Sequence, residues 1–233
     1  MNLPYYVTPE QITKDKADFA RKGISRGRSV IVMQCQEGIL LVAQNGSKSL
    51  HKVAEIYDRI AFAAVGKYNE FESLRQAGVR FADLRGYTYA RSDVNARSLA
   101  NAYAQTMGSI FTEAAKPLEV EIVVAEVGDS LDEDQIYVLS FDGSVADKRG
   151  YLAIGGAAED LNTSLAAKWN TELDLSEAVQ LAVTSLRKNV SNDGSEGQGF
   201  DESELEVALL ERKLPRRKFR RILANELTSL IAG

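Results

Sequence analysis

The sequence has one cysteine and one histidine among its 233 residues, and this scarcity excludes several kinds of site. Cys35 alone cannot form an internal disulfide, which suits a reducing compartment, and we expect the cytoplasm. One cysteine and one histidine cannot build a zinc cluster of the usual spacing. A Ser-His-Asp triad would have to use His51, which lies in a short basic segment and which we interpret as an exposed turn residue.

Long apolar runs and nucleotide-binding glycine motifs are also missing. No run approaches the roughly 20 apolar residues that span a bilayer, and no basic region followed by an apolar stretch predicts a signal peptide. No glycine motif typical of dinucleotide or phosphate binding opens a helix. Gly155 and Gly156 follow a strand and favour a tight strand-to-helix turn over a phosphate site. We therefore expect no cofactor and no metal.

The composition is that of an ordinary globular protein, with 45% apolar and 26% charged residues. This is enough to bury a full core in one large domain or two small ones. The net charge of -5 argues against a dedicated nucleic-acid binder.

Apolar runs in the first third of the chain predict two β-hairpins. Residues 29–33 and 39–43 are separated only by a short polar turn that ends in Gly38. Residues 52–56 and 59–65 form the next pair.

A helix is expected before these hairpins, over residues 8–22. Thr8 can cap it, Pro9 suits the first helical position, and Gly23 ends it. Its few apolar residues form a narrow stripe, so the helix should lie on a surface or against another subunit.

Paired helices and further hairpins alternate along the rest of the chain. Helical periodicity is present in 70–89, 92–116, 157–170, 174–188 and 215–231, and strand patterns in 119–126, 135–141, 151–154 and 205–210. The acidic segment 128–134 is interpreted as a solvated hairpin tip rather than a calcium loop. The glycine-rich segment 189–201 predicts a mobile loop. This order predicts an α+β fold, a four-layer α-β-β-α sandwich in a single domain over 1–233, with a strand and a helix in 205–233.

This arrangement, and several segments within it, resemble the proteasome and its N-terminal-nucleophile hydrolase relatives. The resembling segments are 8–11, 18–23, 38–44, 52–56, 62–66, 86–89 and 99–105, together with Pro117. Pro215-Arg-Arg-Lys-Phe-Arg-Arg221 is similar to the actinobacterial form. The resemblance covers almost the whole chain and implies the four-layer fold of this hydrolase class.

The family has catalytic β-type and non-catalytic α-type subunits, and three positions favour the α type. The catalytic threonine's place is held by Ser29, behind a full helix that leaves it no free amine. The catalytic aspartate's place falls near Gln44 and Asn45, which carry no charge. Lys52 persists, but without its partners it is not an active site.

The resemblance implies roles for two groups of residues. Met1, Asn2, Leu3, Pro4, Tyr5 and Tyr6 would form a gate at the ring axis, anchored by the following helix; the alternative is a terminal segment with no role. Lys52 and Gly66 would line a pocket for the C-terminal tail of an ATPase activator, with Asp18 and Arg21 as weaker candidates at its rim. A lysine ammonium suits a terminal carboxylate, and a glycine allows a peptide backbone to approach.

The implied partners are proteasome β subunits, other α subunits in a seven-membered ring, and a ring-shaped ATPase; we expect neither nucleic acid nor membrane. The tail lacks the tyrosine-aspartate-arginine sequence of archaeal and eukaryotic gates, so closure would use other contacts. Two alternatives stay open: a processed peptidase with Ser29 as its nucleophile, and an assembly scaffold that meets no activator.

Overall fold

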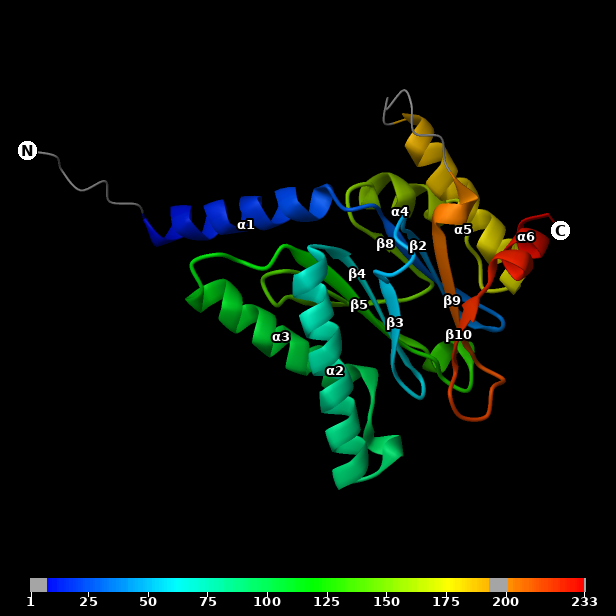
Figure 1. The fold of residues 1–233 in the computed structure, drawn as a ribbon, viewed down its shortest axis with the longest axis horizontal. Coiled ribbons are helices and arrows are strands. Elements are labelled where there is room, and N and C mark those ends of the chain that lie inside the picture. The colour runs from blue at the N-terminus through cyan, green and yellow to red at the C-terminus, as the bar shows by residue number, and fades with distance from the viewer. Residues whose placement is uncertain (1–7, 193–200, 233) are drawn as a thin grey trace, which may run out of the picture.

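The computed structural model describes residues 8–192 and 201–232 (Figure 1). The expected gate, Met1 to Tyr6, lies outside these residues. The expected mobile loop over 189–201 is wrong at its start, because the helix before it continues to Asn192. Residues 193–200 of that loop also lie outside the described part of the chain.

Two five-stranded antiparallel sheets form the centre of the molecule. The first has the order β10 (Phe219–Ile222), β9 (Leu205–Glu211), β2 (Gly38–Gln44), β1 (Val30–Cys35), β8 (Tyr151–Ile154). The second has the order β3 (Val53–Tyr57), β4 (Ile60–Gly66), β5 (Val120–Glu126), β6 (Gln135–Leu139), β7 (Val145–Lys148). Both predicted hairpins are confirmed: β1 pairs with β2 from Val30↔Ala43 to Cys35↔Gly38, and β3 pairs with β4.

The helices of the described residues are α1 (Pro9–Ser25), α2 (Tyr68–Thr88), α3 (Ala96–Glu113), α4 (Ala158–Ala166), α5 (Leu175–Asn192) and α6 (Ala224–Ala232). Short 3-10 turns lie at η1 (Arg91–Asp93), η2 (Leu131–Glu133) and η3 (Glu202–Glu204). None of these helices has both the length and the apolar composition of a membrane-spanning helix.

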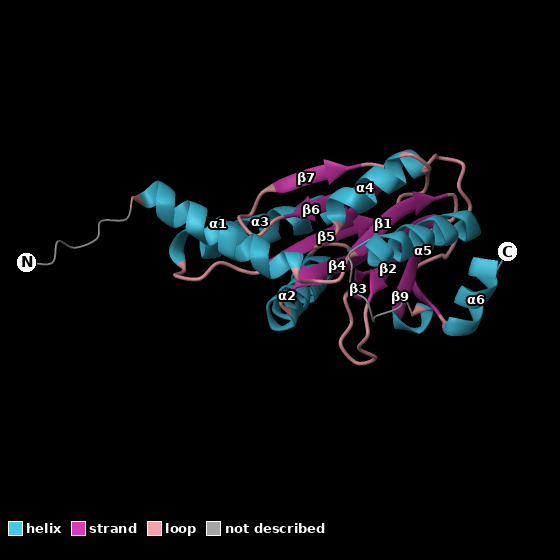
Figure 2. Ribbon diagram, turned by 90° about the horizontal axis from the view of Figure 1, so that it is seen from above, coloured by secondary structure: helices cyan, strands magenta, loops and turns pink. Residues whose placement is uncertain are grey.

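Three apolar clusters define four layers, which Figure 2 shows from above. One cluster lies between the two sheets and includes Val32, Leu41 and Val123. A second fills the space between the first sheet and α4, α5 and α6, and the third lies between the second sheet and α2 and α3. Apart from the exposed edge strand β7, both sheets therefore have an apolar layer on each face, which confirms the predicted four-layer sandwich.

Helix α1 extends away from the sheets (Figure 1). Thr8 caps it, since its side chain accepts the Gln11 amide, and Pro9 occupies the first turn, as predicted. Only Ala20 and Ile24 of its side chains are buried, both near its C-terminal end. Lys16 fastens the middle of the helix, because its Nζ donates to the Phe111 carbonyl at 3.0 Å.

The helix predicted over 215–231 is wrong in its first half. Residues 219–222 form strand β10 instead, paired with β9 from Phe219↔Leu210 to Ile222↔Val207, and α6 begins only at Ala224. An edge strand gains a full ladder of backbone hydrogen bonds from its neighbour, which outweighs a local helical pattern.

A sealed ion pair joins the two sheets at one end of the sandwich. The Asp134 carboxylate, at the start of β6, accepts both guanidinium nitrogens of Arg212, from the turn after β9, at 2.7 and 2.9 Å. Gln34 of β1 donates to the same carboxylate at 2.9 Å. The Asp134 side chain is 0% exposed and that of Arg212 12%. We call these three residues the Asp134 cluster.

Candidate functional site

The connection between α1 and β1, residues 26–29, is where the implied docking residues meet the helix that would carry the gate. Three later segments of the chain hold its backbone, and from one of them the Gln44 amide donates to the Ser29 carbonyl at 3.2 Å. The Gly27 carbonyl accepts the Gly156 amide at 3.2 Å, and the Arg28 carbonyl accepts the Lys52 ammonium at 2.7 Å. We call residues 26–29 the linker.

Glycines allow the linker to pack closely against its neighbours. A Cβ at Gly27 would lie 2.4 Å from Val65 Cγ1, and one at Gly156 would lie 2.2 Å from the Ser25 carbonyl oxygen. Gly155 has a φ of +101°, which favours glycine and makes the tight strand-to-helix turn that the sequence predicted. The Gly155–Gly156 turn thus supports the linker, which explains both glycines without a phosphate.

Ser29 is buried at the end of the linker, and its surroundings do not activate it. Its Oγ accepts the Ala157 amide at 3.4 Å, and its own nitrogen is part of the peptide bond from Arg28. Asn45, near the place expected for a catalytic aspartate, donates its side-chain amide to the Leu50 carbonyl and to Glu206. His51 is exposed, as predicted, in the segment before β3, and it pairs with Glu206.

Lys52 lies immediately before β3, half-buried, with its ammonium directed to the linker. Burial, followed by the positive charge of Arg28, lowers the pKa of Lys52 to about 8, and the carboxylate of Glu206 opposes this shift. The residue is still mostly charged at neutral pH, so it can pair with an anion.

Gly66 ends β4 beside the same linker. The place that a Cβ at Gly27 would take lies 3.2 Å from the Gly66 amide nitrogen. A Cβ on Gly66 itself would meet the Glu119 carbonyl oxygen at 1.9 Å, and its φ is +114°. The pairing of β4 with β5 therefore requires this glycine, whether or not a peptide ever approaches it.

Asp18 and Arg21 lie on the exposed face of α1 and pair with each other at 3.2 Å. Arg21 also lies over the Phe141 ring and borders a cavity of about 280 Å³ with Glu121, whose pKa is raised by burial. In the described part of the chain no hydrogen bond or ion pair joins Asp18 or Arg21 to Lys52. The structure thus brings together Lys52, Gly66 and the linker, while Asp18 lies apart.

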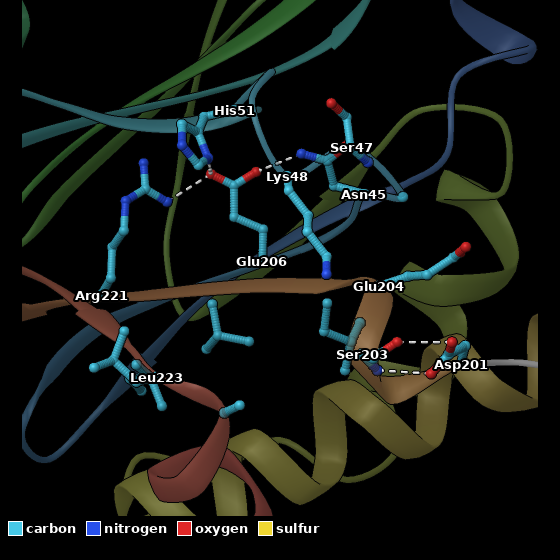
Figure 3. Close-up of a pocket in the computed structure, with 15 residues that line it drawn as sticks. Asn45, Ser47, Lys48, His51, Asp201, Ser203, Glu204, Glu206, Arg221 and Leu223 are labelled. Carbon is cyan, nitrogen blue, oxygen red and sulfur yellow. Dashed lines mark hydrogen bonds and ion pairs between the residues drawn. The ribbon is translucent and has the colours of Figure 1, made fainter.

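Sequence reasoning missed Glu206, which holds the backbone beside Lys52. Figure 3 shows it on β9 with Asn45, His51 and Arg221 directed to its carboxylate. It accepts the amide of Lys52 at 2.8 Å, the side-chain amide of Asn45 at 2.9 Å and Nη1 of Arg221 at 2.7 Å. Its side chain is 8% exposed. An acidic residue inside the apolar strand pattern of residues 205–210 was the available signal.

A second ion pair lies beside this carboxylate. Arg28 pairs through Nη1 with Glu204, and the two side chains are 37% and 35% exposed. The pair lies against Gly46, because a Cβ there would be 3.2 Å from Glu204 Oε1 and 3.4 Å from Arg28 Nη1. Glu204, Lys48 and Glu206 line a cavity of about 400 Å³, drawn in Figure 3.

Comparison with known proteins assigns this architecture to a family. Residues 24–204 match the sequence model of the family described as proteasome subunit. The chain is 58% identical over 231 residues to the proteasome subunit alpha of Thermobifida fusca, covering 99% of this chain and 91% of the relative. It is 59% identical over 233 residues to that of Xylanimonas cellulosilytica, covering 98% and 95%. It is 56% identical over 236 residues to the proteasome subunit alpha of Kineococcus radiotolerans, covering 100% of this chain and 99% of the relative.

Proposed function

Since the chain belongs to the proteasome family as an α subunit of the core particle, we propose that it closes the substrate entrance with its N-terminal residues and docks the C-terminal tails of a ring-shaped ATPase. The observation that carries the proposal is the contact of Lys52 with the linker, because it puts a cation directly beside the connection to α1.

Its role in the particle is non-catalytic, and we place the peptidase sites on β-type partners. The Ser29 nitrogen is bonded to Arg28, so Ser29 offers no free amine to act as a base. Lys52 donates to a carbonyl rather than to the Ser29 hydroxyl.

Exposed apolar side chains support assembly into a ring. Ile12 and Phe19 on α1 are 45% and 48% exposed and border a cavity of about 560 Å³ with Pro117. We assign this surface to a neighbouring α subunit in a seven-membered ring. Tyr87 and Tyr89, 92% and 74% exposed at the end of α2, are assigned to the β ring.

The test of the gate is deletion of residues 1–7 from the chain assembled with its β partner. Hydrolysis of a short peptide that reports entry should increase. Isolated β subunits do not contain the α chain, so the deletion cannot change their hydrolysis of the same peptide, and they serve as the control. No increase in the assembled particle would remove the gating role.

Two further measurements separate the alternatives. The intact mass of the assembled chain should correspond to residues 1–233; loss of residues 1–28 would support a processed peptidase. Lys52→Ala should abolish the stimulation of protein degradation by the ATPase, and unchanged stimulation would support a plain scaffold. Lys168→Ala, at an exposed lysine beyond the end of α4 and away from the cavity beside Glu206, is the matched control.

A further inference from the structure

We propose that Arg28 is a second cation of the docking site and that Glu204 is its resting counter-ion: the terminal carboxylate of an activator tail displaces Glu204 and binds between the Arg28 guanidinium and the Lys52 ammonium. This inference rests on the docking role proposed above. It adds a binding residue and a competing anion within the chain.

Lys52 is hydrogen-bonded to the backbone of the residue that carries the second cation. Lys52 Nζ donates to the carbonyl of Arg28 itself, at 2.7 Å. The guanidinium is close enough for its charge to lower the pKa of Lys52. Two cations close to each other repel, and an anion bound by both relieves that repulsion.

The Arg28 side chain can change partner because water reaches its ion pair. Both side chains of the pair with Glu204 are more than one-third exposed. An exposed pair contributes little to stability, so replacing one carboxylate by another costs little. The guanidinium also offers paired N–H donors that fit a carboxylate.

Glu206 keeps Lys52 in position during such an exchange. It accepts the Lys52 amide at 2.8 Å and the Val53 amide at 3.3 Å, and Arg221 neutralises it. Glu206 is therefore occupied by fixed partners. The Glu204 carboxylate accepts a hydrogen bond from one partly exposed arginine, Arg28, and the Asn45 amide reaches only the Glu204 backbone carbonyl. Of the two neighbouring glutamates, Glu204 is the displaceable one.

The experiment measures binding of a short fluorescent peptide with a free terminal carboxylate to the assembled particle, with the same peptide amidated as its control. Arg28→Gln should weaken binding about tenfold, the effect of losing one charge-assisted hydrogen-bonded contact. Glu204→Gln should strengthen binding severalfold, because the competing anion is gone. Glu202→Gln, an acidic neighbour paired with Arg187, should leave binding unchanged.

The opposite signs distinguish this inference from a purely structural role. If the Arg28–Glu204 pair only stabilised the fold, both substitutions would break the same pair and change binding in the same direction. A change of binding in the same direction for Arg28→Gln and Glu204→Gln, or unchanged binding by Arg28→Gln, would overturn the inference. A loss of binding in Lys52→Ala would still support docking in that case. Equal binding of the carboxylate and amide peptides by every variant would overturn both. Thermal unfolding of each variant reports any loss of fold separately.

Discussion

The Asp134 cluster and Glu206 are two carboxylate-centred links between the same two sheets, and they differ in their contact with water. The Asp134 side chain is fully buried and forms an ion pair with Arg212, whose side chain is nearly buried. Glu206 is also covered, but it borders a cavity, and its partner His51 is 47% exposed. A sealed pair can only hold the sheets together, whereas charges beside a solvent-accessible cavity can exchange partners. The residues that we propose for docking lie at the second link.

The largest effect is expected at the sealed link. Arg212→Ala leaves the Asp134 charge buried and unpaired, which should lower the free energy of unfolding by about 3–5 kcal/mol. Denaturant unfolding of the purified chain measures it. Arg217→Ala is the control, because Arg217 is 73% exposed in its pair with Glu55. A loss no larger than that of the control would remove the distinction between the two links.

We call the link centred on Glu206 the open link. Removal of its carboxylate should lower the free energy of unfolding by less. Glu206→Ala leaves the Lys52 amide and Arg221 without their acceptor, but water from the cavity can replace it, so we expect a loss of about 2 kcal/mol. The same unfolding experiment gives the comparison. A cost equal to or above that of Arg212→Ala would contradict the assignment of Glu206 to the accessible link.

Only the open link should make docking depend on pH in the neutral to alkaline range. The pKa of Lys52 is about 8, so binding of a carboxylate peptide should weaken by up to about tenfold from pH 7 to pH 9 as the ammonium loses its proton. This pKa lies below the unfolded value of 10.5, so the fold itself gains stability from Lys52 between about pH 8 and 10.5. Binding that stays constant over this range would exclude Lys52 as the carboxylate's partner.

The smallest effect is expected for the exposed member of the open link. His51→Gln removes one solvent-exposed pair with Glu206 and should change the free energy of unfolding by less than about 1 kcal/mol. Peptide binding should also be unaltered, because Glu206 keeps Asn45 and Arg221. A change comparable with that of Glu206→Ala would show that His51 maintains the whole link.

The four layers could be predicted because each element has its own periodic signal. The continuous apolar runs of the hairpins and the helical spacing around Leu99 and Tyr103 are local patterns, and both residues are buried as the helical pattern requires. Strand β10 was missed because its pairing with β9 is not local. Its residues, Phe219-Arg-Arg-Ile222, show no alternation of apolar and polar side chains and resemble the start of a basic helix.

The site was only partly predictable for a similar reason. Lys52 was found through the family resemblance, since a lone lysine at a strand end has no distinctive pattern. Glu206 and the Arg28–Glu204 pair depend on contacts across 154 and 176 residues, which no sequence spacing reveals. Gly66 was singled out for peptide approach, yet the strand pairing of β4 already requires a glycine there.

Helix α1 also has a mechanical consequence. Its 17 residues form an arm about 25 Å long, with its buried side chains concentrated near the linker. A rotation of roughly 10° about the linker would move the far end of the helix, at Pro9, by about 4 Å. The contact of Lys16 with α3 and the packing of Ala20 and Ile24 in the core oppose that rotation. A displacement no larger than one hydrogen bond at the Arg28 carbonyl would thus be amplified before it reaches the N-terminal residues.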